Sequence, residues 1–380
     1  MSNTTQGSKR SFFTFAAIDS YIEQNIILPK ETQIQGKNMV EWGTKNLYPD
    51  YLLDLYNNVP TLRSIINGNT DYVAGDDCVI LPLTPDLPAG RMNRRGDTIQ
   101  GQVRNIGLDH WLYGGFALQV IRDLTGRVAE VYYIDIRFLR SNKDGDVFYY
   151  CEKWNKGGVK DVIRYPAFIP DLDWAAMDDE ARAFHASSIL YVKDTHTQTY
   201  PAPVYAAAIK ACEMERLIDD FHISDLNNHF VSSAIINFNN GQPDDNMKEE
   251  IEDEVNEKFC GASNGGRIML SWNPNKESAT DVVEFKVEDF GERYKALSTH
   301  SRQQIFTSFR AIPILFGLTS EANTGFATEE FEQSFKLYNR TQIRPAQRII
   351  CDAYDRIYGR QGVLTIKPFT ISGDTETNVD

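Results

Sequence analysis

The longest stretch of helical patterning lies near the end of the chain, between Glu288 and Gly359. Its first part carries apolar residues at three- and four-residue spacing, which lines up one face of an α-helix. These residues are Phe290, Tyr294, Leu297, Ile305 and Phe309. Pro313 lacks an N–H and disfavours the α conformation at the residue before it, so we expect the helix to end there.

A second long helical pattern follows after a polar segment. Residues 318–326 are small and polar except at their edges, which predicts an exposed loop. Thr328 is a good N-cap and Gly359 a good stop, so a helix is expected between them. Pro345 lies inside that pattern, where a proline costs about 3 kcal/mol. Either two helices abut at Pro345 or one helix is kinked there.

The first half of the chain combines helices with period-two strands. Helices are expected from Pro49 to Asn58, from Thr61 to Gly75 and over 102–112. Alternation of apolar and polar residues predicts two hairpins and two further strands. The strand segments are 116–121, 128–134, 138–141, 147–151, 159–165 and 189–192. The pattern is that of a mainly antiparallel sheet with helices at its side, which is an α+β fold.

Between these regions, the helical pattern resumes over residues 201–230, long enough for a rod of about 45 Å. Strand patterns at 233–238 and 267–272 flank a helical pattern at 244–259, which predicts a small β-α-β unit inserted between two long helices. The helix of this unit carries a row of acids. They include Glu249, Glu250, Asp253, Glu254 and Glu257. The row is either a solvated face or a docking surface for a basic partner.

Composition narrows the possible functions of the 380 residues. The net charge is −14, so the chain as a whole is a poor candidate for gripping nucleic acid by phosphate neutralisation. Five cysteines, none in a C-x-x-C pair, indicate neither a disulfide framework nor a zinc ribbon. No apolar segment reaches the length of a membrane span, and the first ten residues are polar. We therefore expect a soluble protein made in a reducing compartment, with no cofactor or metal.

Enzyme signatures are absent from the sequence. Nucleotide-binding, zinc-protease and hydrolase motifs do not occur. Asn142–Asp146 resembles part of a calcium loop, but its flanking residues would place Arg140 and Cys151 at ligand positions, so a hairpin turn explains it better. Asp171, Asp173 and Asp194 leave open a carboxylate site that binds metal, although isolated aspartates in polar loops are usually turn formers.

The order of these elements resembles that of the portal proteins of tailed bacteriophages, of the HK97-like kind. The likeness covers most of the chain from Gly43 onward and is strongest at Ala311–Gly317 (AIPILFG) and Ile343–Gln347 (IRPAQ). Residues 42–49 and 67–75 resemble the start of portals from phages of Bacteroidetes-type hosts. The motifs are individually weak, and their order carries the resemblance.

The resemblance implies a portal fold, with an α/β wing, two long stem helices, an inserted β-α-β clip, a tunnel loop and a long kinked helix. In order along the chain, its parts would be an N-terminal arm and first helix (1–60), the wing (61–200), stem helix 1 (201–230), the clip (231–286), stem helix 2 (287–312), the tunnel-loop region (313–327), the kinked helix (328–358) and a C-terminal strand and tail (359–380). The short C-terminal part implies a minimal or absent crown. Tyr200–Val204 departs from the family pattern, which leaves the start of stem helix 1 open.

The resemblance also implies sites and partners. The DNA-facing tunnel loop would be Thr319, Ser320, Glu321, Ala322, Asn323, Thr324, Gly325 and Phe326, and the clip acids would dock other proteins. Portals form rings, typically of twelve copies, that conduct double-stranded DNA. Their other partners are the terminase large subunit, a head-tail connector or adaptor and the major capsid protein. They have no catalytic residues and sit at the capsid vertex of the virion, after assembly in the host cytoplasm.

Three cations on the last helix, Lys336, Arg340 and Arg344, either contact phosphates, pair with neighbouring subunits or form ordinary salt bridges. Two other functions stay open beside the portal. One is a different virion connector that uses the inserted unit as an adaptor. The other is a nuclease built on the three aspartates.

Overall fold

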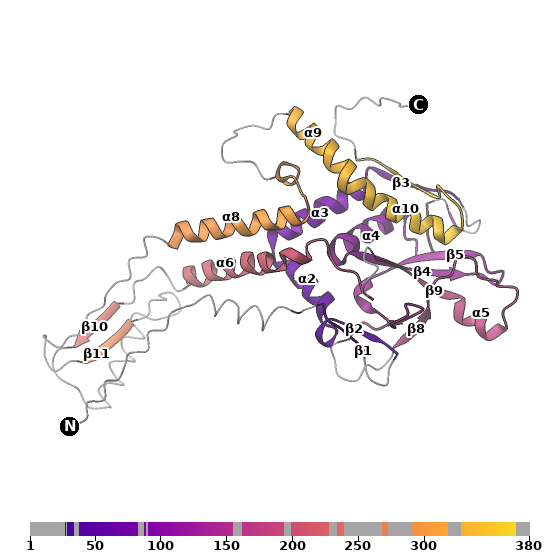
Figure 1. The fold of residues 1–380 in the computed structure, drawn as a ribbon, viewed down its shortest axis with the longest axis horizontal. Coiled ribbons are helices and arrows are strands. Elements are labelled where there is room, and N and C mark those ends of the chain that lie inside the picture. Colours follow the sequence, from indigo (N-terminus) through magenta and orange to yellow (C-terminus); the bar gives the residue numbers. More distant parts are fainter. Residues whose placement is uncertain are drawn as a thin grey trace, which may run out of the picture. The chain divides into compact units, whose positions relative to one another are not determined.

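The computed structural model describes most of the chain. The described residues are 27, 29–33, 38–82, 87–88, 90–154, 162–193, 199–227, 234–238, 268–272, 290–317 and 328–369. They fall into two compact units. The main unit comprises Met1–Lys210 and Ile305–Asp380, and the second unit comprises Ala211–Gln304. The boundaries between them fall inside two helices, α6 and α8, labelled in Figure 1.

With the exception of α5, the helices of the main unit begin and end close to where the sequence predicts. They are α2 (Tyr48–Asn58), α3 (Pro60–Ala74), α4 (Ile99–Tyr113), α5 (Asp179–His185), α9 (Thr328–Tyr338) and α10 (Arg344–Tyr358). Proline lies in the first turn of α2 and of α3, where its missing N–H costs nothing. Gly75 and Gly359 adopt positive φ just after α3 and α10 and end them, as expected. Helix α5 is not predicted by the sequence patterns above.

The strands of the main unit form four small antiparallel sheets instead of the single sheet expected. Their orders are β5-β4-β9, β6-β7-β8, β12-β3 and β1-β2. The strands are β1 (Glu31–Gln33), β2 (Val40–Trp42), β3 (Asp77–Ile80), β4 (Gly115–Arg122), β5 (Val128–Ile134), β6 (Leu139–Ser141), β7 (Val147–Tyr150), β8 (Ile163–Pro166), β9 (Ser187–Lys193) and β12 (Leu364–Lys367). Both predicted hairpins are confirmed. The short 3-10 turn Ile136–Phe138 separates β5 from β6, so the second hairpin starts a new sheet.

One buried guanidinium joins the segment before α2 to the second hairpin. Arg140 on β6 is 1% exposed and has no carboxylate partner within 4.0 Å among the described residues. Its nitrogens donate to Asn46 Oδ1 and to the carbonyls of Asn46, Arg137 and Leu139, at 2.7 to 2.9 Å. Burial lowers the pKa of Arg140 to about 10. The side chain therefore acts as a hydrogen-bonding staple and not as half of an ion pair.

The second unit contains two long helices and one strand pair. Helices α6 (Ile209–Asn227) and α8 (Phe290–Ser308) belong to it for most of their length. Strands β10 (Ala234–Phe238) and β11 (Ile268–Trp272) pair in parallel, in agreement with the expected β-α-β connection. The helix expected between them, over 244–259, lies outside the described residues.

The start of the first long helix differs from the sequence prediction. The helix was expected from residue 201, but α6 begins at Ile209, after the 3-10 turn Ala206–Ala208. Residues 201–203 instead pass close to the end of α4, where a Cβ on Gly114 would lie 2.1 Å from the carbonyl oxygen of Ala202. Pro203 also disfavours the α conformation at Ala202. Close packing and proline together keep this segment out of the helix.

Candidate functional site

The described structure frames the expected tunnel loop but does not include it. Residues 318–327, with all eight candidate loop residues, and the acidic row at Glu249–Glu257 lie outside the described residues. The two ends from which the loop departs, Gly317 and Thr328, are described, and so is Pro345. We therefore describe the residues that hold the chain immediately before and after the expected loop, all of which belong to the main unit.

The first end follows a tightly closed helix terminus. Helix α8 ends in a Schellman motif, in which Ala311 N–H donates to the Phe306 carbonyl and Arg310 N–H to the Thr307 carbonyl, at 2.9 and 3.0 Å. Arg310 occupies the left-handed position of this motif at φ 50, where glycine is usual.

The chain then enters a single 3-10 turn, η5 (Pro313–Phe316), with Pro313 in its first turn. The helix that was expected to end at Pro313 ends earlier, at Ser308. Gly317 closes η5 in the left-handed conformation, at φ 80. The Tyr72 hydroxyl on α3 donates to the Leu315 carbonyl at 2.8 Å. The backbone immediately before the loop is thus held by α3.

An aromatic cluster joins the two ends of the loop, and we call it the loop anchor. It consists of Tyr72, Phe306, Phe316, Phe335, Tyr338 and Phe369, from five segments of the main unit. Phe316, before the loop, lies 5.8 Å from the Tyr338 ring after it, edge to face. Tyr72 lies 5.4 Å from Phe335, also edge to face. Edge-to-face pairs favour one geometry over others, so the cluster fixes both ends against α3.

Two residues of α3 complete the anchor. Gly68 leaves the room that Phe316 occupies, because a Cβ at this position would lie 2.8 Å from Phe316 Cε1. Asn69 is fully buried, and its Oδ1 accepts a hydrogen bond from the Tyr338 hydroxyl at 2.7 Å. Burial raises the pKa of Tyr338, so the phenol stays protonated as a donor at neutral pH. Neither role is visible in the sequence, since an isolated Gly or Asn in a helix carries no signal about its partner.

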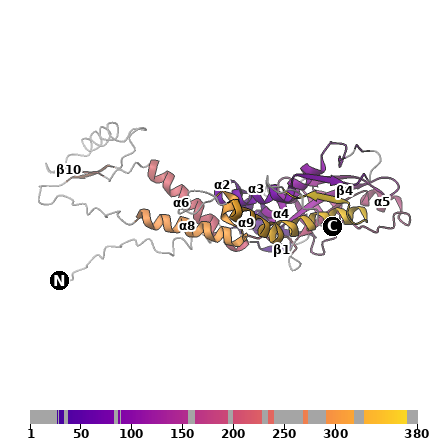
Figure 2. The ribbon, with the colours of Figure 1, turned by 90° about the horizontal axis from the view of Figure 1, so that it is seen from above.

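The second end continues as one helical run through Pro345. Helix α9 passes into a π-helical turn, η6 (Asn339–Ile343), and then into α10 without a non-helical residue between them. Arg344 N–H donates to the Asn339 carbonyl, five residues back. The wider turn lies directly before Pro345, where a proline ring would otherwise press on the carbonyl four residues earlier. The structure shows one continuous helical run with a π turn before Pro345. Figures 1 and 2 show the ribbon of this run from two sides.

Helix α10 is fastened to the helices beneath it. Gln347 Nε2 donates to the Val73 carbonyl on α3 at 3.1 Å. The buried Tyr354 hydroxyl donates to Gln102 Oε1 on α4 at 2.8 Å. The Asp355 carboxylate accepts from the N–H groups of Gly362 and Val363, which turns the chain into β12. The support behind the loop is therefore a fixed framework of α3, α4 and α10.

The described residues of the other candidate sites form turns and no metal site. Asp173 Oδ1 accepts from Ala176 N–H at 3.2 Å, which makes it a turn former, and Asp194 lies outside the described residues. Asn142 Oδ1 accepts from the N–H groups of Gly145 and Asp146, which confirms the hairpin turn at the calcium-like sequence. Among the residues that the structure describes, no group of three His, Cys, Asp or Glu side chains is placed to hold a metal.

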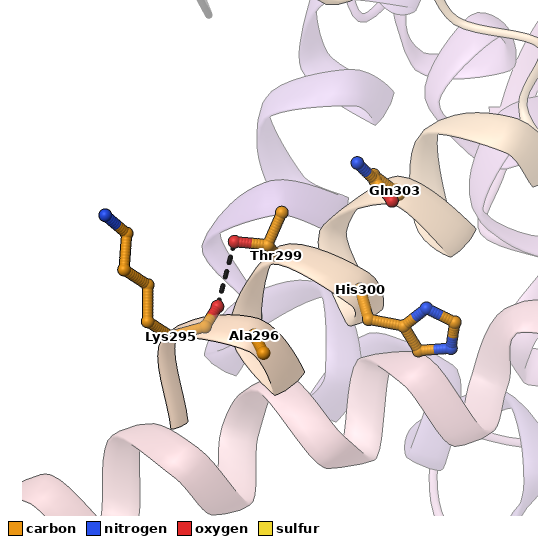
Figure 3. Close-up of a pocket in the computed structure, with 5 residues that line it drawn as sticks. All are labelled: Lys295, Ala296, Thr299, His300 and Gln303. Atoms are coloured by element: carbon orange, nitrogen blue, oxygen red, sulfur yellow. Dashed lines mark hydrogen bonds between the residues drawn. The ribbon is translucent and has the colours of Figure 1, made fainter. Parts of the chain in front are cut away.

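A shallow hollow in the second unit offers no active site either (Figure 3). All of its lining residues come from the single helix α8. They are Lys295, Ala296, Thr299, His300 and Gln303. The Thr299 hydroxyl donates to the Lys295 carbonyl at 2.8 Å and is thus engaged by its own helix.

None of the described helices is long and apolar enough to cross a membrane.

Comparison with solved structures shows the fold. No protein-family model matches the chain, and no curated protein matches it in sequence. A chain of the neck of the empty gene transfer agent (GTA) particle, computed with C6 symmetry, aligns with TM-score 0.54 and 16% identity over 89% of this chain and 86% of that one. A chain of the virion of the native GTA particle aligns with TM-score 0.53 and 16% identity over 93% and 89%. The native GTA neck computed with C12 symmetry gives TM-score 0.51 and 17% identity over 83% of each chain.

A crystal structure of an HK97 family phage portal protein from Corynebacterium diphtheriae is also similar, at TM-score 0.47 and 10% identity over 84% of this chain and 93% of that one. This score is too low to establish a common fold by itself. The fold assignment rests on the GTA structures, whose likeness extends over most of both chains. This chain thus has the fold of a chain in the neck of the GTA particle.

Proposed function

We propose that this chain is a portal protein, a subunit of a homo-oligomeric ring at the capsid vertex through which double-stranded DNA enters and leaves. The observation that carries the proposal is the whole-chain fold likeness to a GTA neck chain, at TM-score 0.54. The GTA neck structures are computed with C6 and C12 symmetry, which supports a closed ring and favours twelve copies. A structural role also fits a chain in which the described residues assemble no catalytic group.

In this proposal the parts of the chain keep the assignments drawn from the resemblance. Residues 61–200 form the wing, 231–286 the clip, and 319–326 the loop that faces DNA. The two stem helices are α6 and α8, so stem helix 1 begins at Ile209 and not at residue 201. The loop anchor supports this assignment, because a loop that touches moving DNA needs both ends fixed while its middle is presented to the channel.

Charge is consistent with a conduit. A duplex carries one negative charge for about every 1.7 Å of its axis, and a strongly basic wall would hold it fast. Twelve copies at −14 each give a ring a formal charge of −168. An acidic, polar wall lets the duplex slide. The partners in this role are the terminase large subunit, a head-tail connector or adaptor and the major capsid protein, with assembly in the host cytoplasm.

Electron microscopy of the purified protein tests the proposal first. We expect rings with a central hole, and a monomer with metal-dependent nuclease activity would contradict it. A different virion connector would also form rings, so a second experiment uses the loop. Deletion of Asn323–Gly325 should leave rings intact and impair DNA packaging or retention, while N323G/T324G removes the two polar side chains and preserves loop length. Packaging equal to wild type in both variants would show that the loop does not act on DNA, and failure of rings to form would show that it is structural.

A further inference from the structure

The outer face of the helical run behind the loop carries a row of four cations. Lys336, Arg340, Arg344 and Arg348 are all exposed, whereas Tyr338, Ile343 and Ala346, which lie between them in the sequence, are buried. The row thus follows the outward side of α9, η6 and α10. From Gln333 to Cys351 the chain has no Asp or Glu at all. At the chain's average of 53 carboxylates in 380 residues, a stretch of that length would hold two or three.

No ion pair of these cations is found in the part of the chain that the structure describes. Among the described residues, none of the four lies within 4.0 Å of a carboxylate oxygen, although seven such pairs occur elsewhere. Glu332 lies four residues before Lys336 and Asp352 four residues after Arg348, at a spacing that permits pairing on a helix. Ordinary salt bridging, one of the alternatives for these residues, is therefore not found in the described part of the chain.

The π turn reduces the angular spread of the four cations around the helical run. In an α-helix of 3.6 residues per turn, each four-residue step overshoots one turn by about 40°, so three steps would rotate Arg348 about 120° from Lys336. The middle step, from Arg340 to Arg344, runs through η6, where i→i+5 bonding makes the turn wider. A wider turn reduces the overshoot and offsets the drift of the flanking steps. The row therefore extends along one side of the helical run for about 18 Å.

We infer that the outer face of α9, η6 and α10 binds the phosphate backbone of double-stranded DNA through Lys336, Arg340, Arg344 and Arg348. This inference rests on the proposed function and adds a second contact to that of the loop. Of the exposed side chains interspersed with the row, Thr341 is polar, whereas Leu337 and Pro345 are apolar. Arg and Lys are the residues that most often contact the phosphate backbone of DNA. The centre of a protein interface is instead depleted of charge and enriched in aromatic residues. The row thus fits a phosphate backbone better than the acidic face of another copy.

Binding of an arbitrary duplex by the full-length protein tests the inference. The variant is R340Q/R344Q, and the control is R127Q/K143Q, which removes two exposed cations from hairpin segments of the main unit. Fluorescence anisotropy with two unrelated 30-base-pair duplexes measures affinity from 50 to 200 mM salt. For each protomer that touches DNA, loss of two phosphate contacts should lower the slope of log affinity against log salt by about 1.8. Affinity at the lowest salt should fall on the order of tenfold for both sequences, and the control should match wild type.

Several outcomes would overturn the inference. The inference is overturned if the wild type binds neither duplex, or if R340Q/R344Q binds as tightly as the wild type. It is also overturned if the control R127Q/K143Q loses as much affinity as R340Q/R344Q. Electron microscopy of the same samples separates this result from the proposed function. If rings of R340Q/R344Q fall apart while duplex affinity is unchanged, the row pairs with an acidic face of a neighbouring copy. A selective loss of duplex binding supports the inference even where wild type forms no rings, in which case only the ring proposal fails.

Discussion

The hydrogen bond between Tyr338 and Asn69 gives a direct test of the loop anchor. Both side chains are buried, at 1% and 0% exposure, and the hydroxyl to Oδ1 distance is 2.7 Å. Asn69 Nδ2 has no partner among the described residues, so this bond is the one that the Asn69 side chain makes there. Tyr338→Phe would leave the whole amide buried without a partner. We expect it to lower the free energy of unfolding by about 1 to 3 kcal/mol.

A double-mutant cycle separates this bond from general packing. Asn69→Leu should also destabilise, because it leaves the Tyr338 hydroxyl without an acceptor. In the double variant no polar group remains unpaired, so its cost should be smaller than the sum of the single costs by about 1 kcal/mol or more. Urea unfolding followed by tryptophan fluorescence reports on the main unit, which contains Trp42, Trp111, Trp154 and Trp174 of the five tryptophans. If the cost of the double variant equals the sum of the two single costs within about 0.5 kcal/mol, the Tyr338–Asn69 hydrogen bond does not contribute to stability.

Three further substitutions follow from the main unit, each measured by the same urea unfolding. Arg310→Gly should stabilise by about 0.5 to 1 kcal/mol, because glycine accepts the left-handed position that ends α8, and Arg310→Ala should give no gain. Arg140→Met should cost about 3 kcal/mol or more, since the Asn46 carbonyl loses its donor and Asn46 Oδ1 keeps only the Trp42 N–H. Arg140→Lys should not restore stability, because an ammonium cannot reproduce the planar set of guanidinium donors. Burial raises the pKa of Asp109, and a folded pKa above the unfolded value means that stability is lost as pH rises through that range. Asp109→Asn should therefore leave the free energy of unfolding unchanged or raise it at pH 7. It should also reduce the loss of stability that the wild type shows as the pH rises from acidic to neutral.

Local signals predicted the elements of this fold well. Gly75 and Gly359 end their helices, and Asn142–Asp146 forms a turn, because each depends on residues next to it in the chain. The single sheet was wrong, and β3 was missed, because pairing between distant segments leaves little local trace. Strand β3 has only four residues and pairs with β12, nearly three hundred residues later. The start of α6 was misplaced for a similar reason, since the close approach of Ala202 to Gly114 is a tertiary contact.

The candidate site was predictable only in outline. The sequence pointed to the loop and to Pro345, but not to Gly68 or Asn69, whose roles depend on what packs against them. Arg140 was likewise noted only as an unsuitable calcium ligand, although it is among the most buried side chains of the chain. A charged residue in a strand is normally predicted to be exposed. The free-energy cost of burying Arg140 is offset only because four oxygen acceptors surround its guanidinium group.

Pro345 links the support of the loop to the cationic row. A proline within a helix would normally cost about 3 kcal/mol and bend the chain, and the π turn before it accommodates the ring while the run continues. The same wide turn offsets the drift that would otherwise spread Lys336 and Arg348 around the helix. A proline that looks like an interruption in the sequence is thus accommodated by a turn that also limits the spread of four cations around the helical run. In the proposed ring, these cations would hold DNA locally and in a salt-dependent way, which suits a duplex that must be retained and later released.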